Sequence, residues 1–146
     1  MRNICVIGTG YVGLVTGTCF AELGNHVSCV DIDEAKVQLL KSGKTPIFEP
    51  GLAELVTRNN AAGRLCFTSS YAEGLRDAEF VFISVNTPTS SEDGGADLRY
   101  VQAAAKSIAQ HLDHELIIVN KSTVPIGTGN LVARIVGEER KSEVRF

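Results

Sequence analysis

The most constraining feature of the sequence is a glycine pattern that follows a short apolar run near the amino terminus. Ile4–Ile7 precedes Gly8, Gly10 and Gly13, which have G-x-G-x-x-G spacing, and helical character continues as far as Leu23. In such a turn the first glycine permits a backbone angle that a side chain would forbid. The second lets the main chain approach a pyrophosphate, and the third lets the helix pack against the strand. Because the N–H groups and dipole at a helix start attract anions, the pattern predicts a phosphate-binding turn.

A second apolar run ends at a carboxylate near the spacing expected for a dinucleotide-binding unit. Val27–Val30 leads directly to Asp31, and a carboxylate about 20 residues after the glycine turn binds the adenosine ribose hydroxyls in such units. The alternative is a tight structural turn with an unrelated surface aspartate. The order of strand, glycine turn, helix, strand and acid favours dinucleotide binding.

Composition and charge exclude several classes of protein. The chain has 146 residues, enough for one domain with a substantial core, and its 44% hydrophobic and 21% charged residues are ordinary for a soluble protein. A net charge of −3 offers no basic surface for nucleic acid, no apolar run is long enough for a membrane span, and the amino terminus shows no signal peptide. We therefore expect a cytoplasmic protein without nucleic-acid or membrane partners.

The cysteines predict neither disulfides nor a metal site. They form no CxxC pair and fall in or beside predicted apolar elements, which favours reduced, buried thiols at Cys5, Cys19, Cys29 and Cys66.

Apolar runs and helical patterns alternate along the rest of the chain. Strands are predicted at residues 4–7, 26–31, 65–68, 79–85 and 116–119, with a sixth beginning within 142–146. Helices are predicted at residues 11–23, 33–40, 50–60, 70–75, 97–112 and 128–136, and a mobile loop at 90–97. This order predicts one α/β domain over residues 1–146, with a doubly wound, mostly parallel, Rossmann-like sheet and helices on both faces.

Two further polar residues occupy positions suited to a bound dinucleotide. Lys36 lies on the first turns of the helix after Asp31 and could reach the adenosine end of the ligand, although a solvated lysine is the alternative. Thr87 directly follows the strand at 79–85, and ligands of open parallel sheets bind beyond the carboxyl ends of the strands. The alternative for Thr87 is a residue held extended by Pro88.

Four motifs occur together in a characteristic order. They are Gly8–Leu14, Phe48–Leu52, Val85–Pro88 and Lys121–Thr128. On these motifs the sequence resembles the amino-terminal domain of the UDP-glucose 6-dehydrogenase family, within the UDP-glucose/GDP-mannose dehydrogenases, over essentially the whole chain.

The resemblance implies an oxidation of UDP-glucose to UDP-glucuronate with reduction of two NAD. It implies that Thr123 also lies near the reacting carbon and helps to order a water, and that the loop at Glu49–Gly51 lies near the nicotinamide half of the site. Together with the turn itself, the implied NAD-binding residues are Gly8, Gly10, Tyr11, Val12, Gly13, Asp31, Lys36, Thr87 and Thr123.

The family's catalytic nucleophile is not found in this sequence. In similar enzymes a cysteine in a glycine-rich, Cys-Phe-Pro-Lys-Asp-like segment, with a helper lysine and asparagine, comes further along, and none of the four cysteines here has such surroundings. We therefore expect an isolated NAD-binding domain that does not oxidise a sugar nucleotide by itself. UDP-glucose or a related nucleotide sugar, and a homo-oligomeric assembly, are expected only of the full-length enzyme.

Alternatives remain for the identity of the domain and for its cofactor. One alternative is another two-domain NAD(P) dehydrogenase, of the hydroxyacyl-CoA or 6-phosphogluconate type, but the Glu49–Gly51 and Ser122–Pro125 motifs argue against it. The other alternative is a free-standing nucleotide-binding or sensor module without catalysis. NAD is expected over NADP, because Asp31 would repel a 2′-phosphate and Ile32 follows it where an arginine would have favoured that phosphate. The positive charge of Lys36 argues in the other direction, since it could partly offset the repulsion of a 2′-phosphate.

Overall fold

A five-stranded parallel sheet forms the centre of the molecule within the part of the chain that the structure describes. The structure is a computed structural model and describes residues 1–89, 95–140 and 145–146. The strands lie in the order β3-β2-β1-β4-β5, and all neighbouring pairs are parallel. Their bounds are β1 Asn3–Ile7, β2 His26–Val30, β3 Leu65–Thr68, β4 Phe80–Ile83 and β5 Ile117–Asn120.

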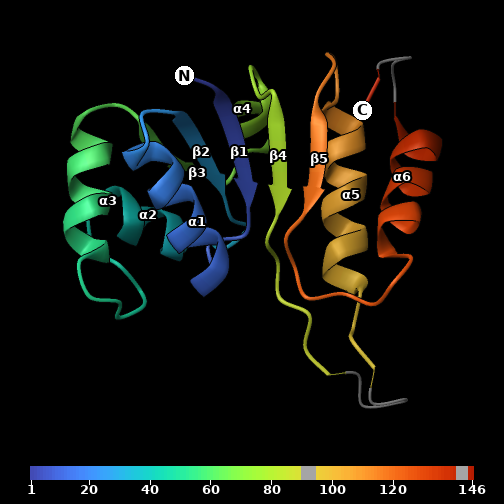
Figure 1. Cartoon of the computed structure of the whole chain (residues 1–146), viewed down its shortest axis with the longest axis horizontal. Helices are drawn as coiled ribbons and strands as arrows, with labels where there is room; N and C mark the ends of the chain where they lie inside the picture. Colours follow the sequence, from blue (N-terminus) through green and yellow to red (C-terminus); the bar gives the residue numbers. More distant parts are fainter. Residues whose placement is uncertain (90–94, 141–144) are drawn as a thin grey trace.

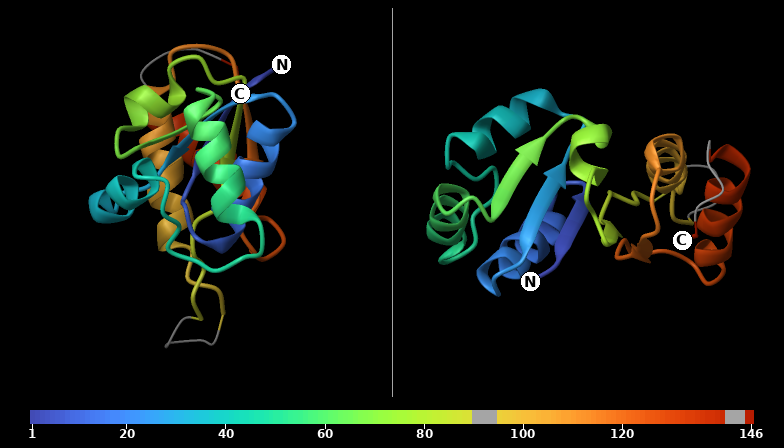
Figure 2. Two further views of the ribbon diagram at one scale, coloured as in Figure 1. Left: turned by 90° about the vertical axis from the view of Figure 1, so that its left-hand side faces the viewer. Right: turned by 90° about the horizontal axis from the view of Figure 1, so that it is seen from above.

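Six helices in the described residues connect and cover these strands. Their bounds are α1 Tyr11–Glu22, α2 Glu34–Lys41, α3 Leu52–Ala61, α4 Tyr71–Leu75, α5 Arg99–His111 and α6 Thr128–Glu139. One apolar cluster joins α1, α2 and α3 to the sheet, and a second joins α4, α5 and α6 to it. Figures 1 and 2 show α5 and α6 side by side at the end of the molecule where the carboxyl terminus lies. The prediction of a doubly wound parallel sheet with helices on both faces is confirmed.

The pattern of buried side chains along each segment matches the strand or helix that the segment forms. In β1 four consecutive apolar side chains are buried because helices cover both faces of a central strand. In α5 the buried side chains recur at three- and four-residue intervals, as expected for a helix with one face on the core. They are Val101, Ala104, Ala105, Ile108 and Ala109.

The prediction of buried thiols is correct for Cys5 and Cys29 and wrong for Cys19 and Cys66, which are exposed. All four are free cysteines. Cys66 lies on β3, one of the two edge strands, and is the exposed residue of a strand whose other three residues are buried.

Most predicted boundaries agree with the structure to within a few residues. Asp33 caps α2 by accepting a 3.1 Å hydrogen bond from the N–H of Lys36, as its position predicted. β4 is shorter than the predicted strand at 79–85 and ends at Ile83, where the N–H groups of Lys121 and Ser122 bond to its carbonyl. The loop predicted at 90–97 falls partly, and the sixth strand at 142–146 largely, outside the described residues; residues 145–146 form no strand.

The parallel arrangement brings all five carboxyl strand ends to one edge of the sheet. In Figure 1 the turn into α1 and the loops that follow β4 and β5 lie together at the lower edge. Every residue expected to contact the cofactor comes from this edge or from α2 beside it.

Candidate functional site

The turn between β1 and α1 requires glycine at two of its three glycine positions because of the protein's own packing. Gly8 has a φ of +96°, and a Cβ on it would lie 2.6 Å from the carbonyl oxygen of Ser84. A Cβ on Gly13 would lie 1.9 Å from the carbonyl oxygen of Gly8, so any side chain would separate the helix from the strand. The predicted roles of these two glycines are confirmed.

At position 10 neither the backbone conformation nor the packing of the protein requires glycine. Its φ is −69°, and the nearest atom to an added Cβ would be Oδ1 of Asn86 at 3.5 Å, an ordinary contact. Gly10 instead lines two hollows at the surface. The missing side chain therefore leaves room for a ligand to approach the backbone.

The first turn of α1 presents unpaired N–H groups beside these hollows. Gly10 is the N-cap without a side-chain hydrogen bond, and the first turn carries no acidic residue. Among the residues that the structure describes, none accepts a hydrogen bond from the N–H of Tyr11, Val12 or Gly13. A helix start with free donors and no nearby carboxylate on its own turn fits a phosphate group.

Asp31 lies directly after β2, is 8% exposed and is held by several donors. Its Oδ2 accepts hydrogen bonds from the N–H of Thr9 at 2.8 Å, the hydroxyl of Thr9 at 2.6 Å and Nζ of Lys36 at 3.0 Å. Its Oδ1 accepts one from the N–H of Asp33 at 3.0 Å. Burial acts to raise the pKa of Asp31, but these bonds outweigh burial and hold its pKa below the ordinary value. The carboxylate is therefore ionised at neutral pH.

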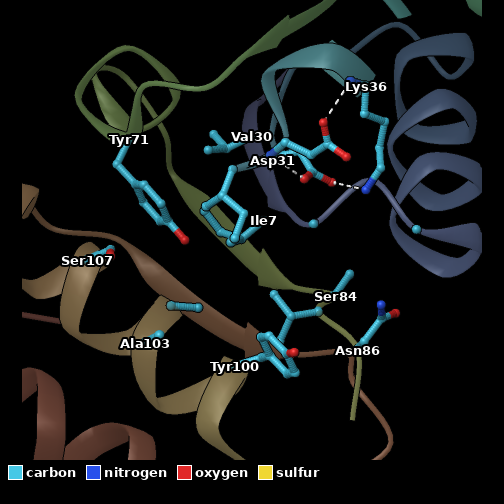
Figure 3. A pocket seen from close by; sticks show the side chains of 16 residues that line it. Ile7, Val30, Asp31, Lys36, Tyr71, Ser84, Asn86, Tyr100, Ala103 and Ser107 are labelled. Carbon is cyan, nitrogen blue, oxygen red and sulfur yellow. Dashed lines mark hydrogen bonds and ion pairs between the residues drawn. The ribbon is translucent and has the colours of Figure 1, made fainter. Parts of the chain in front are cut away.

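A cavity of about 350 Å³ extends from the glycine turn past Asp31. Apolar atoms of Ile7 and Val30 form part of its wall, and Tyr71 of α4 points into it (Figure 3). Tyr100 of α5 lies at the side of the cavity away from Asp31. A cavity of this size with apolar walls and a few polar groups is typical of a small-molecule site.

A second hollow of about 180 Å³ lies beyond the carboxyl ends of β4 and β5. It brings together the remaining predicted site residues, and the hydroxyl of Thr87 donates a 2.9 Å hydrogen bond to the carbonyl of Thr123. The hydroxyl of Ser122 donates to the carbonyl of Val85 at 2.8 Å, so the two loops are joined twice. The predicted members that line the second hollow are Gly10, Tyr11, Val12, Thr87 and Thr123.

The loop between α2 and α3 is connected to the glycine turn by one side-chain hydrogen bond. The phenol of Tyr11 donates to Oε2 of Glu49 at 2.8 Å. This bond raises the pKa of Tyr11, because the negative charge of Glu49 disfavours loss of the phenolic proton. The Glu49–Gly51 motif therefore lies beside the site.

Several residues of the site were not predicted from the sequence. Thr9 is recognisable only as a hydroxyl residue between two glycines. Tyr71 and Tyr100 belong to helices that pack on the sheet, and nothing in their spacing links them to Asp31. Ser84 lines both hollows, is 6% exposed, and has a hydroxyl with no hydrogen-bond partner among the described residues.

The described residues contain neither a metal-binding cluster nor a membrane-spanning helix. They contain no group of three or more His, Cys, Asp or Glu side chains placed to hold a metal ion. None of the helices within them is both long enough and apolar enough to cross a membrane.

Residues 2–146 match the UDP-glucose/GDP-mannose dehydrogenase family, NAD binding domain. Among curated proteins, UDP-glucose 6-dehydrogenase TuaD of Bacillus subtilis is 55% identical over 146 residues, which are 100% of this chain and 32% of that protein. A UDP-glucose 6-dehydrogenase of Pseudomonas aeruginosa is 53% identical over 134 residues, covering 92% of this chain and 29% of that protein. The chain thus spans about a third of the length of the curated relatives that it matches.

Solved structures agree with the sequence comparison. A UDP-glucose dehydrogenase from the archaeon Pyrobaculum islandicum superposes with a TM-score of 0.94 at 42% identity, covering 100% of this chain and 34% of the other. A GDP-mannose dehydrogenase from Pseudomonas aeruginosa, solved as a ternary complex, superposes with a TM-score of 0.87 at 32% identity, covering 96% and 33%. The chain therefore belongs to the UDP-glucose/GDP-mannose dehydrogenase family and forms its NAD-binding domain.

Proposed function

We propose that this chain binds NAD along the carboxyl edge of its sheet and is the cofactor-binding part of a UDP-glucose 6-dehydrogenase. The observation that carries the proposal is the glycine turn with Asp31 beside it. Gly10 leaves its backbone open where neither φ nor packing requires glycine, and an ionised carboxylate adjoins the same cavity. Relatives above 50% identity that bear the name UDP-glucose 6-dehydrogenase support the choice of enzyme.

The two hollows meet at Gly10 and suggest how the halves of NAD are arranged. The pyrophosphate would bind the free N–H groups of Tyr11, Val12 and Gly13 at the start of α1. The adenosine half would occupy the larger cavity, with the ribose hydroxyls bound by Asp31 and Lys36. The base would then lie toward the apolar wall and the two tyrosines.

The nicotinamide half would occupy the smaller hollow between the loops after β4 and β5. Thr87 and Thr123 line this hollow, and the hydrogen bond between them holds the two loops together. Bound NAD supplies the hydride acceptor for alcohol oxidation, whereas the protein supplies position and electrostatics. Thr123 is the residue of this chain that we assign next to the reacting centre, where its hydroxyl would order a water.

The choice of NAD over NADP gives the most direct test of the site. Asp31 is ionised and already accepts a hydrogen bond from Lys36, so the lysine charge is partly neutralised and little of it remains for a 2′-phosphate. Titration calorimetry on this chain should show tighter binding of NAD than of NADP, and Asp31→Ala should weaken NAD binding. Equal or tighter binding of NADP would overturn the proposal, and so would an Asp31→Ala variant with unchanged affinity for NAD.

The oxidation of UDP-glucose itself is proposed for the longer protein. The buried thiol of Cys5 has its pKa raised by burial, and burial also raises the pKa of Cys29, so neither is a nucleophile at neutral pH. Cys19 lies on α1 and Cys66 on the edge strand β3, and neither lines either hollow of the site. The chain with NAD and UDP-glucose should therefore produce no reduced nicotinamide, whereas sustained turnover that Cys66→Ser abolishes would contradict this assignment.

The proposal also covers the cellular compartment of the protein and its oligomeric state. Four free thiols favour a reducing compartment, and we place the protein in the cytoplasm on that ground. A homo-oligomer of the longer protein stays a prediction from the family resemblance.

A further inference from the structure

We propose that Thr9 is a positioning residue for the cofactor, because it orients the carboxylate of Asp31 toward the 2′-hydroxyl of the adenosine ribose. The proposal rests on the assignment of the larger cavity to the adenosine half of NAD. It gives a role to the residue between the first two glycines, which touches no ligand in the arrangement described above.

Thr9 is a buried residue of the glycine turn that donates two hydrogen bonds to Asp31. Its side chain is 1% exposed, and it lines neither hollow. Two of its groups bond to the same carboxylate oxygen, Oδ2 of Asp31: the hydroxyl at 2.6 Å and the N–H at 2.8 Å. A backbone donor and a side-chain donor from one buried residue define the orientation of that carboxylate more closely than either would alone.

The other donors to Asp31 constrain it less. Lys36 carries its ammonium group on a long side chain with 29% exposure, so it follows the carboxylate and does not fix it. The N–H of Asp33 is a single donor to Oδ1. Since the last torsion of an aspartate is broad and roughly two-fold, loss of the Thr9 hydroxyl would leave the carboxylate freer to rotate about that torsion.

The distribution of donors identifies the oxygen that remains available to a ligand. Each carboxylate oxygen offers about two lone-pair sites, and Oδ2 already accepts hydrogen bonds from two groups of Thr9 and from Lys36. Oδ1 accepts only that of Asp33 among the described residues. The acceptor for a ribose hydroxyl is therefore Oδ1, and its direction depends on how Thr9 holds Oδ2.

ADP and 2′-deoxy-ADP separate this role from a purely structural one. Both nucleotides keep the base and the diphosphate, and they differ only in the 2′-hydroxyl, which would donate a hydrogen bond to Asp31. Their dissociation constants are measured by calorimetry on the 146-residue chain and on the variants Thr9→Val, Thr9→Ser and Thr18→Val. Thr18 is the matched control, since it is also a buried threonine, but its hydroxyl donates to the carbonyl of Leu14 within α1 at 2.7 Å.

The unaltered chain should bind ADP about tenfold more tightly than 2′-deoxy-ADP, as expected for a hydrogen bond to a charged group. In Thr9→Val that ratio should fall to about two, because ADP loses affinity and 2′-deoxy-ADP does not. Thr9→Ser, which keeps the hydroxyl, and Thr18→Val should retain the original ratio. Should Thr9→Val fail to fold by thermal unfolding, Thr9→Ala replaces it as the variant without a hydroxyl.

The binding measurements give different results when the proposed function is wrong and when only the role of Thr9 is wrong. If the unaltered chain binds neither nucleotide, the assignment of the cavity to adenosine is wrong. If the unaltered chain discriminates between the nucleotides and folded Thr9→Val or Thr9→Ala discriminates equally well, Thr9 does not position Asp31. An equal loss of affinity for both nucleotides would also overturn the inference, because it would reveal a general disturbance of the turn.

Discussion

The hydroxyl of Thr87 donates a 2.9 Å hydrogen bond to the main-chain carbonyl of Thr123, across the gap between the loops that follow β4 and β5. These residues are 36 positions apart in the sequence, and both line the smaller hollow beside the glycine turn. The bond means that the two residues expected to contact the nicotinamide half of NAD do not move independently. The loops are joined again by the bond from Ser122 to Val85.

Thr87→Val removes this hydrogen bond while keeping the size and branching of the side chain. We expect the affinity for NAD to fall about two- to tenfold, which corresponds to the net worth of one hydrogen bond. The affinity for ADP should not change, because ADP lacks the nicotinamide half. Calorimetry with both ligands checks this, and Thr57→Val is the control, since Thr57 bonds to the carbonyl of Gly43 away from the site. An equal loss of affinity for ADP would show that Thr87 acts on the whole domain.

Gly13→Ala and Gly137→Ala should have opposite effects on the free energy of unfolding. An added Cβ at Gly13 would lie 1.9 Å from a backbone oxygen, and we expect a loss of about 2 kcal/mol or more. Gly137 lies in α6 with open space around it, and alanine there should stabilise the protein by about 0.5–1 kcal/mol. Urea unfolding of both variants measures these changes. Similar stability of Gly13→Ala and the unaltered chain would mean that α1 can move away from β1 without cost.

The parts of the fold that were predicted from the sequence depend on local patterns. The strand at Ile4–Ile7, the glycine turn and Asp31 follow one another along the chain, so their spacing is visible in the sequence. Parallel pairing then follows from alternating strands and helices, and it brings Thr87 and Thr123 to the same edge as Gly10.

The parts that were not predicted depend on contacts between distant segments. Tyr71 reaches the cavity because α4 packs against β1 and β2, and no local pattern reports which side of a helix will face a ligand. Cys66 is exposed on β3, one of the two edge strands, and neither strand order nor the cover that helices give a strand is readable from that strand alone. The bond of Thr9 to Asp31 joins residues 22 positions apart, and it exists only once β1 and β2 are paired.

The hydrogen bond from Tyr11 to Glu49 should be measurable through the titration of the phenol. Its pKa is raised because the bond and the charge of Glu49 favour the protonated phenol. Glu49→Gln removes the charge, so the pKa of Tyr11 should fall toward its ordinary value. Carbon NMR of labelled tyrosine resolves Tyr11, and Tyr11→Phe assigns its signal. An unchanged titration in Glu49→Gln would mean that the loop at Glu49–Gly51 is not held against the glycine turn in solution.

His114 should make the stability of the chain depend on pH near neutrality. Its Nδ1 lies 2.6 Å from Oδ1 of Asp113, and its Nε2 lies 2.8 Å from the carbonyl oxygen of Ala78. Both partners are acceptors, so only the protonated ring can donate to both. The bond to Asp113 therefore raises the pKa of His114 despite partial burial, with further contributions from the carbonyl of Ala78 and the charge of Asp77.

Because the pKa of His114 is higher in the folded than in the unfolded state, protonation favours folding. This contribution is fully present below the unfolded-state pKa of about 6.5 and is lost as pH rises through the higher folded-state value. The free energy of unfolding, measured by urea titration from pH 6 to pH 9 (about the span in which a raised histidine titrates), should fall across that transition. Asp113→Asn, which removes the main cause of the shift, should flatten the fall, and His114→Gln should abolish the part due to this ring. A stability that rises over the same range in the unaltered chain, or an identical profile in His114→Gln, would show that the ring is not held between these two acceptors.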